Sequence, residues 1–162
     1  MRTYVRKPVR RAALGVAAAA TAVLTALAPT ASAAPASADG GIYMYKNMAT
    51  GECLDYDGRK VYDFACNGGP YQRWLLTDAG FGTYTLRNIA TAKCLDTNGS
   101  AVYARACNDG PTQRWGIFDA QSGTKQLQNL AFSGKCLDND TRKIYLFGCN
   151  GGTYQSWAEY RV

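Results

Sequence analysis

The sequence predicts an all-β protein in which three similar units close into one barrel. Three positions per unit, two cysteines and one tryptophan, recur at steps of 41 and then 42 residues. The segments between them are short, rich in Tyr, Val, Leu and Ile, and bounded by turn residues. Three units of about 40 residues, each with about four strands, fit one closed barrel, because a single repeat cannot bury its apolar face alone. A propeller blade has a similar length, but a propeller needs about four blades or more.

Each unit carries the same motifs in the same order, from an Asn-apolar-Ala opening to a Gln-x-Trp close. In the first unit these are Asn47-Met48-Ala49, Cys53-Leu54-Asp55, Val61-Tyr62, Cys66-Asn67-Gly68-Gly69 and Gln72-Arg73-Trp74. We expect the repeated apolar positions to form the core: Leu54, Leu95, Leu137, Val61, Val102, Ile144, Trp74, Trp115 and Trp157. The expected strands include residues 42–45, 84–86 and 143–147. Asp57-Gly58 and Asn98-Gly99 are typical of two-residue hairpin turns.

Residues 1–33 have the layout of a secretion signal. Five basic residues precede an apolar run at about 12–28, and Ala31-Ser32-Ala33 is an A-x-A cleavage site. A second such site at 36–38 extends the expected cleavage range to Asp39, and Arg10-Arg11 leaves twin-arginine export open. A membrane anchor is the alternative, but the run is Ala-rich and short for a span. We therefore expect a secreted protein with a flexible tail at 34–40 and no membrane insertion after signal removal.

Removal of this segment changes the charge of the protein. All five of its charged residues are basic, so 13 of the 18 Lys and Arg remain against 12 Asp and Glu. A net charge of +1 gives no reason to expect nucleic acid as a partner.

The cysteines indicate disulfides and not a metal site. Their number, six, is even, and the cysteines of an exported protein are oxidised to disulfides outside the cytoplasm. Equivalent units should pair in equivalent ways, which predicts Cys53–Cys66, Cys94–Cys107 and Cys136–Cys149. Bridges between units are the alternative. The sequence has no histidine and no Cys-x-x-Cys pair, so we expect no metal and no cofactor.

These motifs resemble the ricin B-chain type lectin domain, a β-trefoil with three Gln-x-Trp repeats that also serves as a carbohydrate-binding module. The resemblance covers about residues 41–162, with repeats at about 41–79, 80–120 and 121–162. It implies a β-trefoil with pseudo-threefold symmetry and one shallow sugar site in each unit. In such a site the Asp of Cys-Leu-Asp accepts hydrogen bonds, and an aromatic platform lies two residues before the second cysteine. The site is completed by a polar residue before the platform, an Asn ahead of Gln-x-Trp, and the Gln of that motif.

The resemblance places candidate carbohydrate-binding residues in every unit, with units one and three the more complete. They are Asp55, Tyr62, Phe64, Tyr71 and Gln72 in unit one and Asp138, Tyr145, Phe147, Tyr154 and Gln155 in unit three. Asp96, Tyr103, Arg105 and Gln113 form a weaker site in unit two, where Arg105 replaces the platform.

Three departures weaken the pattern. The expected Asn is replaced by Tyr71, Thr112 and Tyr154, and the polar residue before the platform is replaced by Tyr62, Tyr103 and Tyr145. The segment after Cys-Leu-Asp is also too short to fold over the site as a wall. Tyr62 and Phe64 share one face of a strand, because side chains alternate along it. A flat ring with one or two acceptors suits a pyranose, which has an apolar face and a polar edge.

Two functions follow from these observations. The first is a non-catalytic carbohydrate-binding protein whose partner is a glycan or polysaccharide and whose weak sites act together. The second is a protein-binding trefoil: an adaptor or subunit of a secreted, toxin-type assembly, or an inhibitor, with another secreted protein as partner.

Catalysis has little support in the sequence. A chain without histidine has no Ser-His or Cys-His device. The close carboxylate pairs, Asp55 with Asp57 and Asp138 with Asp140, are the remaining alternative. Unit two has Asn98 at the matching turn, and aspartates commonly occupy turns for conformational reasons. We therefore predict no enzyme activity and no catalytic residues.

Overall fold

The structure, a computed structural model, describes residues 40–162; the predicted signal peptide and residues 34–39 of the predicted tail lie outside this range. The described residues form twelve strands and four short 3-10 helices. The strands are β1 (Ile42–Asn47), β2 (Cys53–Tyr56), β3 (Val61–Phe64), β4 (Trp74–Gly80), β5 (Thr83–Asn88), β6 (Cys94–Thr97), β7 (Val102–Arg105), β8 (Trp115–Asp119), β9 (Lys125–Asn129), β10 (Lys135–Asn139), β11 (Ile144–Gly148) and β12 (Trp157–Arg161). The 3-10 helices are η1 (Pro70–Gln72), η2 (Pro111–Gln113), η3 (Gln121–Gly123) and η4 (Thr153–Gln155). No helix within residues 40–162 has the length and apolarity that a membrane crossing requires.

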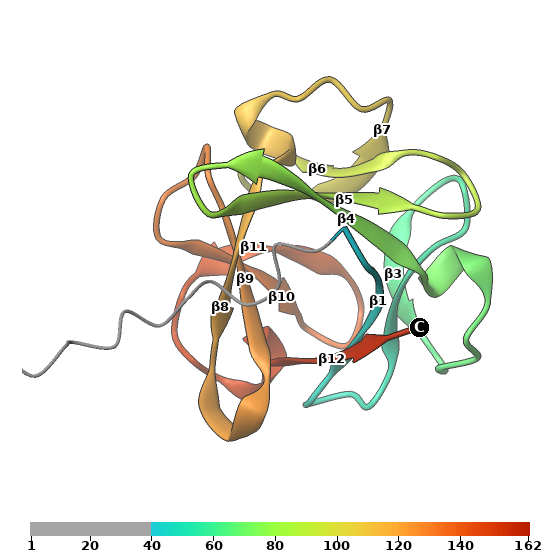
Figure 1. The fold of residues 1–162 in the computed structure, drawn as a ribbon. Helices are drawn as coiled ribbons and strands as arrows, with labels where there is room; N and C mark the ends of the chain where they lie inside the picture. Colours follow the sequence, from blue (N-terminus) through green and yellow to red (C-terminus); the bar gives the residue numbers. More distant parts are fainter. Residues whose placement is uncertain (1–39) are drawn as a thin grey trace, which may run out of the picture. The chain divides into compact units, whose positions relative to one another are not determined.

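Six of the strands form a closed barrel. The antiparallel pairs run from β1 to β4, β5, β8, β9 and β12, and β12 pairs again with β1. The ring is therefore closed by the first and last strands, which lie side by side in Figure 1. Closure leaves no free edge in this part of the sheet.

The other six strands form three hairpins, one per unit. β2–β3, β6–β7 and β10–β11 attach to the ring through β1, β5 and β9, and each attachment includes the first cysteine of its unit. A six-stranded barrel with three hairpins in pseudo-threefold arrangement is a β-trefoil. The predicted fold class is confirmed.

The core consists of the repeated apolar residues that the sequence indicated. The leucine of Cys-Leu-Asp and the tryptophan of Gln-x-Trp are 0% exposed in all three units, and Val61, Val102 and Ile144 are buried. The indole Nε1 of Trp74 donates to the Leu54 carbonyl at 3.1 Å, and the other two units repeat this bond. The two motifs recur together because each supplies half of this buried hydrogen bond.

The three disulfides join the cysteines within each unit, as predicted: Cys53–Cys66, Cys94–Cys107 and Cys136–Cys149. The alternative of bridges between units is wrong. Each disulfide ties the base of a hairpin to the loop that follows it, and closure of such a loop contributes about 3 kcal/mol to stability.

The hairpin turns differ from the prediction. Between β2 and β3 lie four residues, 57–60, instead of two, and the same holds for 98–101 between β6 and β7. The Asp57 carboxylate accepts the backbone N–H groups of Arg59 and Lys60, which stabilises the longer turn. Gly58 supplies the positive φ of 92° that this turn needs.

Neighbouring units are linked by the asparagine that opens each repeat. The Asn88 side chain donates to the Tyr71 carbonyl of unit one, and Asn129 donates to Thr112 of unit two. Asn47, near the start of the domain, donates to the Tyr154 carbonyl of unit three. Each unit therefore holds the loop that precedes Gln-x-Trp in another unit.

Candidate functional site

The hairpin and following loop of unit one surround an open hollow of about 440 Å³, here the unit-one hollow. The hairpin supplies Asp55 from β2 and its cross-strand neighbour Tyr62 from β3. The residues that define the hollow are Asp55, Asp57, Tyr62, Phe64, Asn67 and Tyr71.

Unit three has an equivalent unit-three hollow of about 390 Å³. Asp138 and Tyr145 are again cross-strand neighbours, here on β10 and β11. The defining residues match those of unit one position by position: Asp138, Asp140, Tyr145, Phe147, Asn150 and Tyr154.

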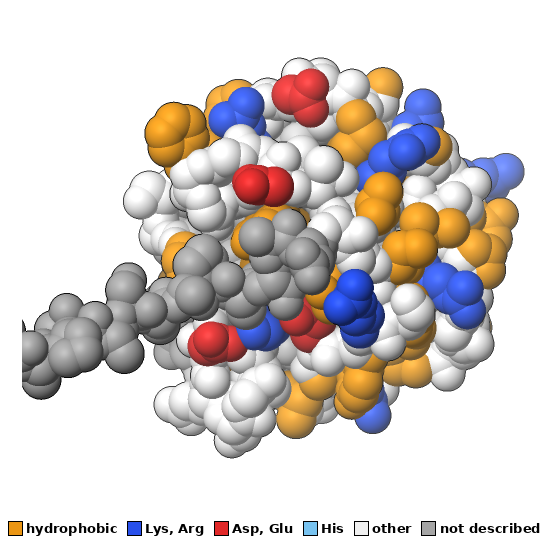
Figure 2. All heavy atoms as spheres, in the orientation of Figure 1, with side chains coloured by type: hydrophobic (Ala, Val, Ile, Leu, Met, Phe, Trp, Pro, Cys, Tyr) orange, Lys and Arg blue, Asp and Glu red, His pale blue; other side chains and the backbone are white. Residues whose placement is uncertain are grey.

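Both hollows have an aromatic rim. The ring centroids of Tyr62 and Phe64 lie 6.1 Å apart, and those of Tyr145 and Phe147 lie 6.2 Å apart. The platform rings are half-exposed, Phe64 at 49% and Phe147 at 55%. On the face drawn in Figure 2, hydrophobic side chains likewise reach the surface, on the right among Lys and Arg. Exposed rings of this size are available for stacking.

A buried carboxylate lies at the base of each hollow. Asp55 and Asp138 are each 4% exposed. Asp138 Oδ2 accepts from Gln155 Nε2 at 2.7 Å. Asp55 Oδ1 is buried and has no hydrogen-bond partner among residues 40–162. Burial raises the pKa of the Asp55 carboxyl, while contacts with Gln72 and the Tyr56 backbone act in the opposite direction.

The hollows are electronegative. Burial, and then the negative charges of Asp55 and Asp57, raise the pKa of Tyr62. The pKa of Tyr145 is raised in the same way, by burial and by Asp138 and Asp140. Both tyrosines therefore remain neutral hydroxyls at physiological pH.

The glutamine of Gln-x-Trp lies beneath each hollow and is 0% exposed in every unit. Gln72 Nε2 donates to the Ala65 carbonyl at 3.0 Å, and its Oε1 accepts the Asn67 N–H at 2.9 Å. Gln72 thus holds the loop that carries Asn67. Gln113 and Gln155 make the same loop contacts and also donate to the aspartate of their unit.

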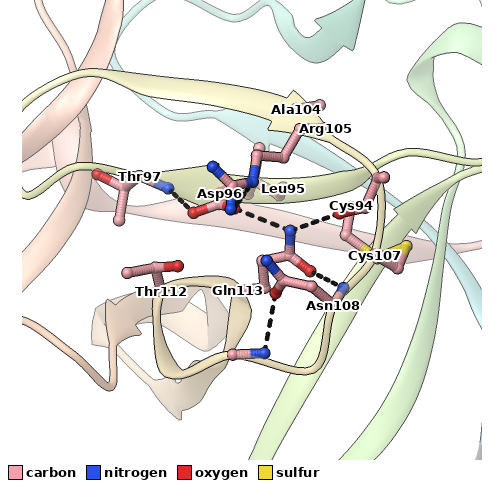
Figure 3. Close-up of polar contacts among 12 residues, drawn as sticks. Cys94, Leu95, Asp96, Thr97, Ala104, Arg105, Cys107, Asn108, Thr112 and Gln113 are labelled. Atoms are coloured by element: carbon pink, nitrogen blue, oxygen red, sulfur yellow. Dashed lines mark hydrogen bonds and ion pairs between the residues drawn. A yellow bond between two sulfur atoms is a disulfide. The ribbon is translucent and has the colours of Figure 1, made fainter.

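Unit two differs because Arg105 occupies the place of the platform and contacts the carboxylate directly (Figure 3). Arg105 Nε lies 3.0 Å from Asp96 Oδ2, which also accepts from Gln113 Nε2 at 2.8 Å. Asp96 Oδ1 accepts the Thr97 N–H. Both oxygens of Asp96 are therefore satisfied within the protein.

The structure thus brings the predicted site residues together in all three units, but in two arrangements. Units one and three have open hollows with an aromatic rim, whereas in unit two the arginine and carboxylate form an ion pair. Tyr103 is the cross-strand neighbour of Asp96, as Tyr62 is of Asp55.

Two pairs of residues that line the hollows were not predicted as carbohydrate-binding residues, although the second pair was considered for catalysis. Asn67 and Asn150 directly follow the second cysteine, and Asp57 and Asp140 lie in the hairpin turns. The repeated Cys-Asn motif was visible in the sequence. Its side chain was not placed at the site, because the path of that loop depends on its bonds to the buried glutamine.

Comparison with known proteins agrees with this architecture. The model of the ricin-type β-trefoil lectin domain matches residues 41–157. A search of curated proteins found no significant match.

Among solved structures, ThreeFoil, a designed threefold-symmetric protein, is 28% identical with a TM-score of 0.68, over 76% of this chain and 100% of that one. An exo-β-1,3-galactanase from Clostridium thermocellum is 25% identical with a TM-score of 0.69, over 76% of this chain but 31% of that one. A ricin B-like lectin from Macrolepiota procera, solved with lactose, is 20% identical with a TM-score of 0.65, over 76% and 97% of the two chains. By its repeats, its trefoil and this match over most of its length, the chain belongs to the ricin-type β-trefoil lectin family.

Proposed function

We propose that this chain is a secreted, non-catalytic carbohydrate-binding protein that binds glycans in the unit-one and unit-three hollows. The observation that carries the proposal is the recurrence of one arrangement in two units. In each, an exposed phenylalanine stands beside a tyrosine over a buried aspartate. A pyranose ring placed on the phenylalanine would direct its hydroxyls towards the carboxylate.

The proposed sites are altered relative to the family pattern, and the structure suggests what replaces the missing groups. Asn67 and Asn150 line the hollows and offer amides where the family Asn is absent. Tyr71 and Tyr154, each almost half-exposed, widen the apolar surface. Shallow sites of this kind bind weakly one at a time, so two on one chain favour multivalent glycans.

The proposal includes no catalytic step. The sequence has no histidine, and all six cysteines are in disulfides. Asp57 and Asp140, the second carboxylates of the two hollows, accept backbone N–H groups in their turns. Purified protein should therefore release no reducing sugar from any glycan that it binds.

The test is a glycan array followed by calorimetric titration of the best ligand. The double variant Phe64→Ala with Phe147→Ala should weaken binding about 10- to 100-fold, since each removed ring contributes about 1.5–3 kcal/mol of apolar contact. Phe118→Ala is the matched control, because Phe118 is also half-exposed but lies on β8, outside both hollows. Wild-type protein that binds no glycan, or a double variant that binds as well as wild type, would contradict the proposal.

A protein-binding trefoil is the second candidate, and one observation favours it. The rings of Phe64, Tyr71, Phe147 and Tyr154 are each 44–55% exposed, and aromatic side chains of this kind anchor protein interfaces. A tagged protein should then retain one partner from culture medium, and the same double Phe variant should release it. Elution of the native protein as a lone monomer contradicts this candidate.

A further inference from the structure

A third hollow lies where the tips of the three hairpins meet. This axis hollow, of about 330 Å³, is lined by residues from all three units. Its floor includes the equivalent buried side chains Val61, Val102 and Ile144, one from each unit. It therefore lies near the pseudo-threefold axis, at the point where β3, β7 and β11 contact one another.

The rim of the axis hollow is basic on two sides and small on the third. Lys60 comes from unit one, and Arg142 and Lys143 come from unit three. At the matching positions unit two has Ser100 and Ala101, whose side chains are small and uncharged. The three basic residues are exposed, and among the described residues none of them forms an ion pair.

The carboxylates of the same turns lie outside the axis hollow. Asp57 and Asp140, in the same two turns, line the unit-one and unit-three hollows and not the axis hollow. Their Oδ1 atoms accept backbone N–H groups of the turns. These bonds, and then the positive charges of Lys60 and Arg59, lower the pKa of Asp57, so it stays charged within its own hollow.

The axis hollow shares one lining tyrosine with each of the other two hollows. Tyr62 lines the unit-one hollow and the axis hollow, and Tyr145 lines the unit-three hollow and the axis hollow. Lys60 Nζ lies 4.8 Å from the Tyr62 ring centroid, and Lys143 Nζ lies 5.1 Å from that of Tyr145. These cation–π contacts hold the two ammonium groups beside the aromatic rims.

We propose that the axis hollow binds the carboxylate or sulfate group of an acidic glycan whose neutral sugars occupy the adjoining hollows. The proposal rests on the function proposed above for those hollows and assigns the class of glycan. Charge supports this order: each outer hollow contains two carboxylates and repels an anion, whereas the centre presents three cations. Charge-assisted hydrogen bonds from arginine and lysine are the usual means of holding such groups.

The first experiment measures the axis hollow by itself. Sodium sulfate and sodium glucuronate are titrated separately against ¹⁵N-labelled protein, with glucose as the neutral probe. We expect saturable amide shifts at residues 60–62, 100–102 and 142–145, and the stronger of the two anions identifies the preferred group. Shifts spread over all basic surfaces, or equal shifts with glucose, would overturn the proposal. Because the titration uses small anions, it tests the axis hollow even if no glycan binds the outer hollows.

The second experiment compares acidic glycans with neutral counterparts of the same backbone. The triple variant Lys60→Gln, Arg142→Gln, Lys143→Gln should bind acidic glycans about tenfold more weakly and keep its affinity for neutral ones. The control triple Arg87→Gln, Lys93→Gln, Arg161→Gln removes three exposed charges elsewhere and should change neither. Added salt should weaken only the acidic series.

Two results of this second experiment overturn the inference. One is equal affinity of the wild type and the first triple variant for acidic glycans. The other is competition by double-stranded DNA as effective as that of the acidic glycan, which would make the hollow a general polyanion surface. Loss of both acidic and neutral binding in the Phe64→Ala, Phe147→Ala variant concerns the outer hollows and leaves the anion titration to decide.

Discussion

Units one and three differ from unit two at the platform position, and that difference decides whether the carboxylate of the unit is ion-paired. All three units share the disulfide, the buried leucine, glutamine and tryptophan, and the same hairpin. Where units one and three have Phe64 and Phe147, unit two has Arg105, whose guanidinium lies on the Asp96 carboxylate. The scaffold of this trefoil and the side chains at its platform position can therefore change separately.

The largest expected effect is the loss of protein stability when the ion-paired aspartate of unit two is replaced. Asp96→Asn should lower the free energy of unfolding by about 1.5–3 kcal/mol, the range for hydrogen bonds to a charged group. Asp96 accepts from Thr97 on one oxygen and from Gln113 and Arg105 on the other, so an Asn side chain must turn its NH₂ towards a donor. Urea unfolding at pH 7 measures the loss. A change below about 0.5 kcal/mol would show that the contacts of Asp96 contribute little to the free energy of unfolding.

A gain of binding is the next test of the contrast. Arg105→Phe restores the platform of units one and three, because it supplies the ring and leaves Asp96 without its guanidinium partner. Titration calorimetry with a glycan bound by wild-type protein should then find three sites per chain in place of two. Arg87→Phe, at an exposed position on β5, serves as the control for an added surface ring. A stoichiometry that stays at two would mean that unit two lacks more than its platform.

The smallest expected effect is that of Asp55→Asn, with the opposite sign to that of Asp96→Asn. Burial raises the pKa of Asp55, and its Oδ1 has no hydrogen-bond partner among residues 40–162, so the charge costs stability at neutral pH. The variant should be more stable at pH 7 by about 0.5–1 kcal/mol, yet lose glycan binding in the unit-one hollow.

This gain has a definite pH dependence. A carboxyl whose pKa is raised by folding favours the folded state at low pH and loses that contribution as the pH rises through the folded pKa. At about pH 3, below the usual Asp pKa of about 3.9, the wild type and Asp55→Asn should therefore be equally stable. Their difference should appear as the pH rises, and denaturant unfolding at several pH values checks it. A difference that is largest at pH 3 would contradict the assignment.

The scaffold could be predicted from the sequence because the same residues have the same structural role in all three units. Leu54 and Trp74 share a buried hydrogen bond that recurs in each unit, so the repetition itself marked them as structural. The disulfide pairing followed from the same equivalence.

The surface was less readable, because it depends on where loops and long side chains turn. The sequence identified Arg105 as a missing platform but contained no sign that its guanidinium reaches Asp96. Asn67 lines a hollow only because Gln72 fixes the path of its loop. The axis hollow combines residues about 40 apart in sequence, which only closure of the barrel brings together.

The bonds between the opening asparagines and the loops before Gln-x-Trp have a consequence for assembly. The loop that carries Tyr154 in the unit-three hollow is held by Asn47, on the first strand of the domain. That hollow is therefore complete only after unit three has docked against the first strand of the domain. If the proposed function holds, glycan affinity at unit three reports on closure of the ring. A fragment consisting of unit three alone would have the right residues without the partner that orders them.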